Sequence, residues 1–300
     1  MFLLSACASL AAGATAPTRP SMLTGAAPGD VVHYFGVGSN MLRSKIVSRG
    51  INGSSIEVLE MRPALVRGHR LAFNMRGFPP LEPGMGGIEE SPAEECHGAL
   101  CTMTAENYEK LWQSEGGAMP NPGYEEIVVE AEGYGLPQRV RAVALRARPH
   151  VRLRRDADPS QRYMRMLVDG AKELGLTSEY VAKLEAITTQ RATGVLRMLA
   201  VQHLFFATLL FRPRLRWAGR AISAMLWVAY VPSSHPTALR RYAGNVCLSL
   251  LLLPTAFLGT LVRLGMWATG KEIPPMMKAV MQPPKAEPEA PPMRDSEIDF

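Results

Sequence analysis

The chain has 300 residues, of which 47% are hydrophobic, and this is enough to bury a sizeable core in one or two domains. Its four cysteines are too few and too scattered for the disulfide framework of a small secreted protein. The formal net charge of +6 is concentrated locally, because carboxylates are absent between Glu185 and Glu272 while arginines continue beside uncharged runs, so we expect lipid and no nucleic acid as the partner of that segment.

The N-terminal residues carry a weak targeting pattern. Residues 1–16 are small and apolar but lack a basic start, so they resemble a truncated secretory leader or part of an organellar one. A linker rich in Pro, Gly and Ala follows. We therefore assign residues 1–30 to a leader and linker, and we place the start of the folded domain at Val31.

A strand, a tight loop and a helix are predicted next. Residues 31–37 are rich in β-formers and end in Gly38-Ser39-Asn40, and residues 41–49 have helical composition. Backbone N–H groups at such a junction lack intrahelical partners, so they can bind a carboxylate or carbonyl oxygen of a small substrate. The same tripeptide is also an ordinary turn and helix cap.

The middle of the domain is predicted to be mainly β-structure. Residues 56–88 and 97–103 have the composition of strands interrupted by Gly and Pro, with residues 77–87 as a mobile loop, and residues 127–131 and 139–147 return to strand.

The cysteines and histidine in this region do not predict a metal site. Cys96 and Cys101, which flank His97, are five residues apart, a spacing that puts them on opposite faces of a strand. We expect no metal ligands in this protein.

Glu115 is the most informative residue on the helix predicted from Thr104 to Gly116. Tyr108 and Trp112 lie on its apolar face, and Glu115 is the next position on that stripe. A carboxyl group turned inward beside aromatic rings would have a raised pKa, in the range that suits a general base. The alternative is that Glu115 turns outward at a frayed helix end.

Two helices are predicted to end the domain. Asp158 as N-cap and Pro159 at the first helical position favour a helix that runs to Gly175 with Tyr163 on its inward face, and a second helix begins at Ser178. Strands first and helices last indicate an α+β fold with a mainly antiparallel sheet or small barrel.

Beyond the domain the chain becomes apolar and basic. The uncharged runs at residues 198–211 and 221–231 are too short to cross a bilayer, whereas residues 243–262 reach the roughly 20 residues that a spanning helix needs. We predict that residues 198–270 contact membrane lipid and that residues 243–262 span the bilayer. The alternative is a buried hairpin of a soluble domain.

The predicted division of the chain follows from these patterns. Residues 31–190 form the folded domain, residues 191–272 a basic, hydrophobic, membrane-associated extension, and residues 273–300 a disordered tail rich in Pro. We expect a membrane-associated protein whose folded domain faces the cytosol or the organellar stroma.

Three blocks, in order, resemble the γ-glutamylcyclotransferase family. Residues 34–41 are similar to the Tyr-Gly-Ser-Asn signature that opens the family, and residues 97–124 are similar to its central strand, its catalytic-Glu helix and the Tyr strand that follows. Residues 159–180 are similar to its C-terminal helical pair. The resemblance extends over residues 31–187.

The resemblance implies a fold and a site. The fold is a small, mainly antiparallel β-barrel with flanking helices, to which this chain adds a C-terminal hydrophobic helical extension. Glu115 would be the catalytic acid/base, with no cofactor. The substrate-binding residues implied by the resemblance are Tyr34, Phe35, Gly36, Val37, Gly38, Ser39, Asn40, Tyr124 and Tyr163.

The implied activity is the intramolecular cyclisation of γ-glutamyl peptides or amino acids to 5-oxoproline, with release of the amino acid. The alternatives within the family are a cyclotransferase specific for glutathione and one for γ-glutamylamines. A third alternative is a catalytically silent, membrane-tethered binding domain, which is indicated by Val37, since the family usually has an aromatic residue before Gly-Ser-Asn.

Overall fold

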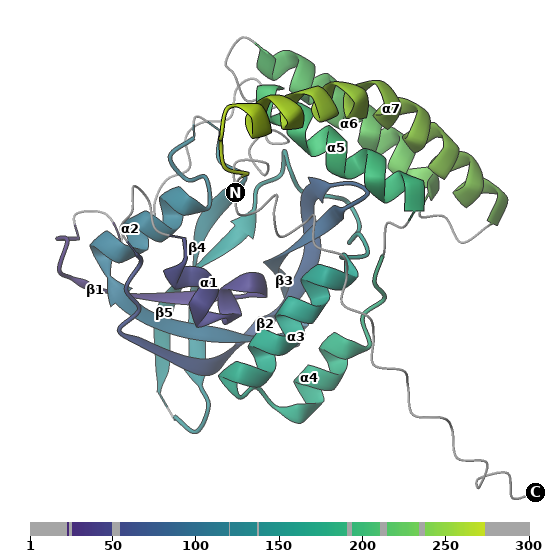
Figure 1. The fold of residues 1–300 in the computed structure, drawn as a ribbon. Coiled ribbons are helices and arrows are strands. Elements are labelled where there is room, and N and C mark those ends of the chain that lie inside the picture. Colours follow the sequence, from purple (N-terminus) through teal and green to yellow (C-terminus); the bar gives the residue numbers. More distant parts are fainter. Residues whose placement is uncertain are drawn as a thin grey trace, which may run out of the picture.

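The computed structural model describes residues 23, 26–49, 55–119, 121–136, 138–190, 194–210, 215–233 and 238–273. A five-stranded barrel carries short helices on its outer side, and three longer helices form a separate layer beside it (Figure 1). Most of the predicted leader and almost all of the predicted tail lie outside the described residues.

The barrel closes in the strand order β1-β3-β2-β4-β5. These strands are β1 (Val31–Gly36), β2 (Glu60–Phe78), β3 (Glu82–Thr104), β4 (Tyr124–Gly133) and β5 (Arg139–Ala147). Every pair is antiparallel except β1 with β5, which pair in parallel at Tyr34 and Val143. The predicted α+β class and mainly antiparallel barrel are therefore confirmed.

The prediction of a mobile loop at residues 77–87 is wrong, because most of these residues belong to one long β2–β3 hairpin. Its pairing runs from Glu60 with Thr102 to Phe78 with Glu82. The glycines here serve close packing: a Cβ on Gly84 would lie 2.9 Å from the carbonyl oxygen of Ala157. Glycine in a strand often marks such an approach of another backbone, although the composition of such a strand resembles that of a loop.

Two short helical turns replace the single helix predicted over residues 41–49. The 3₁₀ turn η2 (Gly38–Met41) follows β1, and α1 (Arg43–Val47) comes after it. Leu42 interrupts them with an extended backbone, φ −91° and ψ 115°. The chain changes direction at this interruption, so that the residues after α1 return towards η2.

The start of α2 (Ala105–Ser114) is where the sequence predicts it. Thr104 caps the helix by accepting a hydrogen bond from the Asn107 N–H. The helix begins here because the cap satisfies one of the N–H groups that have no partner in the first turn.

The start predicted for the next helix is wrong by two residues. Ser160 caps α3 (Gln161–Leu174), accepting a hydrogen bond from the Tyr163 N–H, and α4 (Ser178–Glu185) follows. Asp158 is not the cap, because Pro159 is not helical: its carbonyl accepts the Gln190 N–H, and Ser160 forms a β-bridge with Gln190.

The core of the barrel lies between its strands and α2. Its largest fully buried members include Tyr34, Met103, Tyr108 and Leu111. A second cluster joins α3 and α4 to the barrel through residues such as Leu167, which is completely buried. These two clusters fix the helices that carry the site described below.

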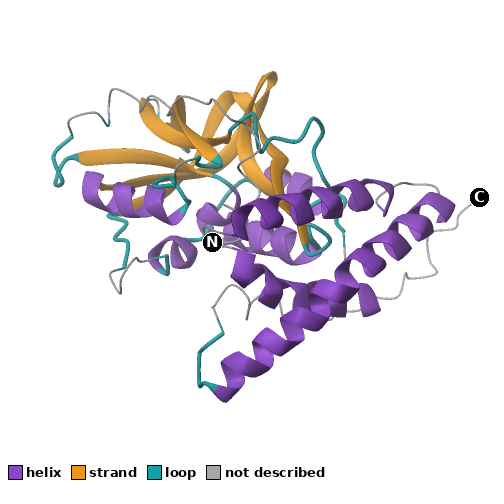
Figure 2. Cartoon of the chain, turned by 90° about the horizontal axis from the view of Figure 1, so that it is seen from above, coloured by secondary structure: helices purple, strands orange, loops and turns teal. Residues whose placement is uncertain are grey.

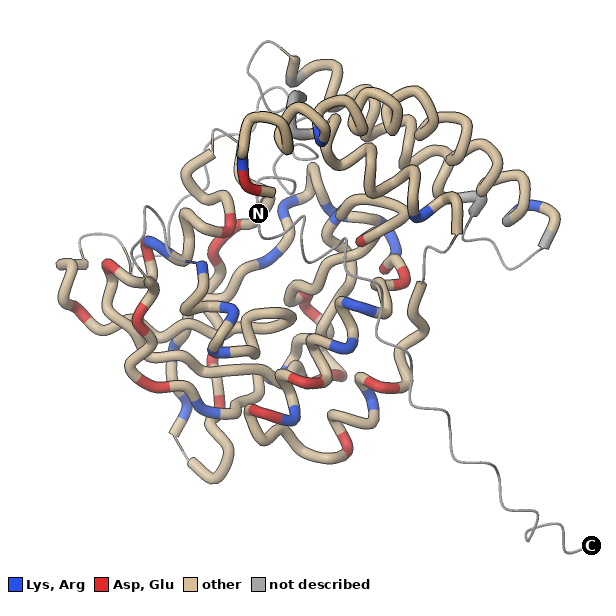
Figure 3. The backbone as a smooth tube through the Cα atoms, viewed as in Figure 1, with Lys and Arg blue, Asp and Glu red and all other residues tan. Residues whose placement is uncertain are grey.

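Three apolar helices form the C-terminal extension: α5 (Gly194–Leu210), α6 (Arg216–Ser233) and α7 (Ala238–Ala268). Figure 2 shows them as a layer at one side of the strands, and Figure 3 shows few charged residues on them compared with the barrel. Their shared core includes Leu81 from the turn of the β2–β3 hairpin. The extension therefore packs on the barrel.

One described helix is long and apolar enough to cross a membrane by length and composition. It covers Tyr242–Ala268 within α7, and 22% of its most apolar window is buried. The predicted span at residues 243–262 lies inside it. α7 approaches α5 closely at Gly259, where a Cβ would overlap the Gln202 backbone.

Candidate active site

Five of the predicted site residues come from five different elements of the fold. Tyr34 comes from β1, Asn40 from η2, and Glu115 follows the last turn of α2. Tyr124 begins β4, and Tyr163 lies in the first turn of α3. All of these side chains are buried or nearly so.

The Glu115 carboxylate is directed into the domain, and 7% of its side chain is exposed. Asn40 Nδ2 donates a hydrogen bond to Glu115 Oε1 at 3.1 Å and another to Tyr34 Oη at 2.7 Å. The Arg49 guanidinium forms an ion pair with the same carboxylate oxygen. The structure thus places a buried carboxylate beside the glycine-containing turn, with partners that stabilise its charge.

Tyr163 closes the site from the side of α3. Its hydroxyl oxygen accepts the Gly86 N–H at 3.0 Å. It also lies against Gly38, which has a φ of +63°, and a Cβ added at that glycine would be 2.7 Å from the hydroxyl. Residue 38 must therefore be glycine both for its backbone conformation and for space.

We expect Gly38→Ala to lower the free energy of unfolding by more than Gly135→Ala. Both glycines have positive φ, so alanine costs about 1–2 kcal/mol at either position. Only Gly38 adds a clash with Tyr163, worth roughly another 1–3 kcal/mol, since nothing lies within 4 Å of a Cβ at Gly135. Urea denaturation measures both, and equal losses would show that the contact between Gly38 and Tyr163 is not tight.

The three site tyrosines share one electrostatic environment. Burial raises the pKa of Tyr34, Tyr124 and Tyr163, and the positive charge of Arg49 opposes this rise in each case. Burial lowers the pKa of Arg49 itself, while these tyrosines oppose that shift. The hydroxyls are therefore neutral hydrogen-bonding groups near pH 7.

Three of the predicted binding residues do not present side chains to Glu115. Phe35 faces a separate apolar cluster of the barrel, because successive residues of a strand point to opposite faces, and Val37 packs on that cluster. Gly36 leaves little room: a Cβ there would lie 3.1 Å from the Tyr34 ring and from Asn40. These three residues can meet a ligand only through their backbone or by shaping the turn.

Arg49 is the site residue that sequence reasoning missed. Its Nη2 donates to Ser39 Oγ at 2.9 Å, and its guanidinium pairs with Glu115. The sequence offered only an arginine at the end of a short helical stretch. Nothing in local spacing predicts that this side chain meets a carboxylate from a helix that follows two further strands.

No group of three or more metal-binding side chains occurs among the residues that the structure describes. Cys96 and Cys101 are both buried, and burial raises the pKa of each thiol to about 12. The ring of His97 stacks on Tyr180 with 4.3 Å between centroids. These three residues are thus engaged in packing.

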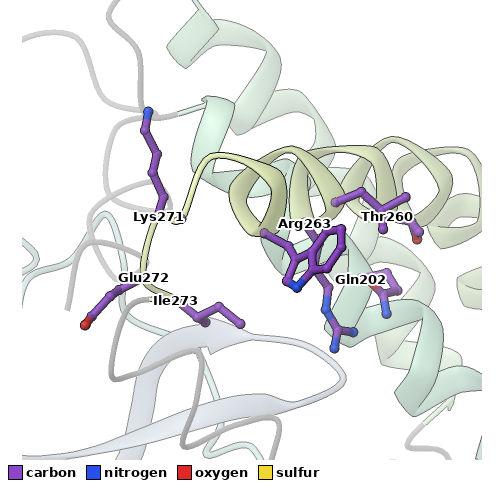
Figure 4. Close-up of a pocket in the computed structure, with 9 residues that line it drawn as sticks. Gln202, Thr260, Arg263, Lys271, Glu272 and Ile273 are labelled. Atoms are coloured by element: carbon purple, nitrogen blue, oxygen red, sulfur yellow. The ribbon is translucent and has the colours of Figure 1, made fainter.

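Two cavities lie away from Glu115. The larger, of about 590 Å³, opens between α5 and α7, where Arg263 and Gln202 point into the space beside Trp267 (Figure 4). The other, of about 500 Å³, lies beside His97 and Tyr134. Neither of these two cavities is lined by a predicted site residue.

Comparison with known proteins gives one family match and two curated relatives. Residues 95–184 match the AIG2-like family. A gamma-glutamyl cyclotransferase gliK of Claviceps purpurea is 31% identical over 140 residues, which are 45% of this chain and 62% of that protein. A protein of the same name from Aspergillus fumigatus is 26% identical over 179 residues, 52% of this chain and 63% of that protein. The chain thus spans less than two thirds of either relative.

Solved structures with a similar fold include an uncharacterized human protein, at 26% identity and a TM-score of 0.45. A structure named gamma-glutamyl cyclotransferase has 24% identity and a TM-score of 0.46. Each comparison covers 55% of this chain and 92% of the other. The segment that matches the AIG2-like family, residues 95–184, contains Glu115, Tyr124 and Tyr163.

Proposed function

We propose that this chain is a γ-glutamylcyclotransferase, which cyclises γ-glutamyl peptides or amino acids to 5-oxoproline and releases the amino acid; the match of residues 95–184 to the AIG2-like family and the similarity to a gamma-glutamyl cyclotransferase gliK support this proposal. The observation that carries the proposal is the buried Glu115 carboxylate beside the turn at Gly38 and Ser39. Residues 31–190, which contain every predicted site residue, are proposed as the catalytic domain.

The reaction needs a base and a folded substrate. The substrate's α-amino group is mostly protonated at neutral pH, because its ordinary pKa is about 8. Glu115 accepts a proton from it, and the freed nitrogen attacks the γ-carbonyl carbon of the same molecule. A new C–N bond closes the five-membered lactam, and Glu115 gives its proton to the leaving amine as the original amide C–N bond breaks. The ring nitrogen then loses its second proton to Glu115, which passes it to the released amine, so the amine leaves as an ammonium and the carboxylate is restored. No water or cofactor is consumed.

Positioning supplies much of the rate in an intramolecular reaction of this kind. In the proposed complex, the turn at Gly38 and Ser39 holds one end of the substrate, and Tyr163 closes the site behind it. The neutral hydroxyls of Tyr34 and Tyr124 orient the γ-glutamyl chain so that its amine reaches its carbonyl. Burial excludes water, which strengthens each of these contacts.

The purified full-length chain tests the proposal when incubated with γ-glutamyl-alanine, glutathione and γ-glutamyl-lysine. We expect chromatography to detect 5-oxoproline from the first substrate. Product from glutathione or γ-glutamyl-lysine alone would favour the corresponding alternative specificity. Binding without any 5-oxoproline would favour the silent binding domain, for which Val37 in the signature is the motivation.

We further propose that the extension holds this domain at a membrane through α7. Large apolar side chains on α7 are exposed at intervals of mostly three or four residues, so they form one stripe along the helix. The exposed stripe comprises Leu239, Tyr242, Val246, Leu250, Leu253, Phe257, Leu258, Leu261, Leu264 and Trp267. An apolar surface of this extent is typical of a protein or membrane contact.

The face of α7 opposite the exposed stripe is buried, and this limits how the helix can contact lipid. Leu248 and Leu252 are buried against α5 and α6, which are held to the barrel domain in turn: His203 of α5 stacks on Phe78, and Tyr230 of α6 donates to Gln190. Lipid can therefore reach one side of α7. This arrangement supports a helix that lies along the membrane surface, in place of the spanning helix expected from length.

The charge of the extension supports a lipid partner. It has no carboxylate before Glu272, so nothing in it repels anionic lipid, and its arginines attract phosphate. The aromatic residues Tyr242 and Trp267 are exposed in the stripe, and their side chains suit the boundary between water and lipid at which a surface-lying helix is found.

We expect the double substitution Leu250→Asp and Phe257→Asp to release the full-length chain from vesicles that contain phosphatidylserine. Each of these side chains is about two thirds exposed, and burying one stabilises binding by about 1.5–3 kcal/mol, so partitioning falls about 100-fold or more. Leu136→Asp, at an exposed position of the barrel, is the matched control.

Vesicle sedimentation measures the effect. An intact chain that stays in the supernatant would contradict the membrane proposal, and retention of the bound protein after alkaline carbonate would favour a spanning α7.

A further inference from the structure

We infer that Arg49 is the group that recognises the α-carboxylate of the substrate, and that it exchanges Glu115 for this carboxylate when the substrate binds. The inference rests on the proposed function. It gives the site a way to select γ-glutamyl compounds whose α-carboxylate is free.

The position of Arg49 is the first step of the argument. Its side chain is 19% exposed, it pairs with Glu115, and its charge acts on Tyr34, Tyr124 and Tyr163. The guanidinium therefore lies between Glu115 and Ser39, two of the residues proposed to surround the substrate. Its Nη2 is held by Ser39 Oγ, in the turn that would bind the substrate.

The charges of the substrate are the second step. A γ-glutamyl end carries an ammonium and a carboxylate on the same carbon. If the ammonium is to give its proton to Glu115 through Oε1, it must approach the oxygen that already pairs with Arg49. The guanidinium and the substrate ammonium therefore compete for one partner.

Charge balance decides what happens to the displaced guanidinium. A buried Arg49 without a partner is unfavourable, and so is a substrate carboxylate placed unpaired beside the Glu115 carboxylate. An exchange of ion-pair partners leaves neither charge unpaired, because the ammonium pairs with Glu115 while Arg49 pairs with the α-carboxylate. The site then holds two ion pairs where it held one.

The geometry of arginine suits this exchange. The planar guanidinium offers five N–H donors, enough to keep Ser39 Oγ and still bind a carboxylate through two parallel hydrogen bonds. The ammonium and the carboxylate are attached to one carbon, so a movement of a few ångströms carries Arg49 from one partner to the other. A lysine side chain lacks this planar pair of donors and would replace only the positive charge of Arg49.

A specificity follows for the substrate. A compound whose α-carboxylate is converted to a carboxamide still brings the ammonium to Glu115, but it leaves Arg49 unpaired in a buried site. Breaking one half of such a pair is costly, so we expect the free acid to be preferred in kcat/KM by about 100-fold or more.

The experiment compares γ-glutamyl-alanine with its α-carboxamide analogue, using the full-length chain and chromatography of the two lactam products. The intact protein should prefer the acid by about 100-fold or more. Arg49→Gln should lose most of its activity on the acid and little on the carboxamide, so that the preference falls below about 10-fold. Arg49→Lys should lie between the two.

Arg43→Gln is the matched control. Arg43 belongs to α1, and its guanidinium donates to the Val58 carbonyl without contacting the site. A purely structural loss lowers activity on both substrates by the same factor, so Arg43→Gln should leave the preference unchanged.

The outcomes separate the two proposals. Equal turnover of acid and carboxamide by the intact protein would overturn the role of Arg49 and leave the cyclotransferase intact, even if Arg49→Gln fails to fold. An unchanged preference in Arg49→Lys and Arg49→Gln would do the same. Absence of either lactam would remove the proposed function and the role of Arg49 with it.

Discussion

Glu115→Gln should abolish nearly all 5-oxoproline formation while the barrel stays folded. Glutamine has the shape of glutamate but cannot accept the proton of the substrate ammonium, and general acid–base catalysis typically supplies 10²–10⁴-fold. We therefore expect kcat on γ-glutamyl-alanine to fall by about that factor, measured by chromatography of the released 5-oxoproline. Asn40, which donates to Glu115, retains an acceptor in the amide oxygen.

Glu106→Gln is the matched control for this substitution. Glu106 lies in the first turn of the same helix, α2, where its side chain is exposed and pairs with Lys110. An exposed pair of this kind contributes little, so activity should be unchanged. Calorimetry with a γ-glutamyl analogue should still detect binding to the Glu115→Gln variant. Near-normal turnover by that variant would refute the role assigned to Glu115.

Leu167→Ala should lower the free energy of unfolding by about 2–5 kcal/mol. Leu167 is completely buried in the cluster that joins α3 to the barrel, together with Met41 and Tyr163. The truncation leaves a cavity behind the residue that closes the site, so we also expect slower turnover at temperatures where the protein remains folded. Urea denaturation measures the loss of stability through the shift in midpoint at constant slope.

Glu173→Ala is the control for the stability prediction, because Glu173 lies on the exposed face of the same helix. Substitutions at such positions usually change stability by less than about 0.5 kcal/mol. If the two variants unfold at the same urea concentration, α3 is not held to the barrel through Leu167.

Features encoded within one or two turns of chain could be predicted from the sequence. Thr104 predicts the start of α2, because its side chain accepts a hydrogen bond from an N–H group in the first turn of the helix. The apolar stripe of that helix carries Glu115 inward, and the composition of β1 followed by Gly38 indicates the tight turn. The order of strands and helices was sufficient for the α+β class, and the family resemblance implied the barrel in place of an open sheet.

Features that depend on distant backbone could not be predicted. Asp158 has the better local cap signal, but Ser160 caps α3 because Pro159 and Ser160 are paired with the distant Gln190. Residues 77–87 have the composition of a loop, but they pair along the hairpin, where close approach of Ala157 leaves room only for glycine at residue 84.

The sequence by itself thus determined the local frame of this protein: a strand ending in a glycine turn, a capped helix that carries a carboxylate inward, and an apolar C-terminal extension. Only the tertiary structure decided that Arg49 meets Glu115, that β1 and β5 close the barrel, and which face of α7 is covered. Backbone propensity and side-chain periodicity act over a few residues, whereas the partner of a buried charge is chosen when distant segments are brought together by packing.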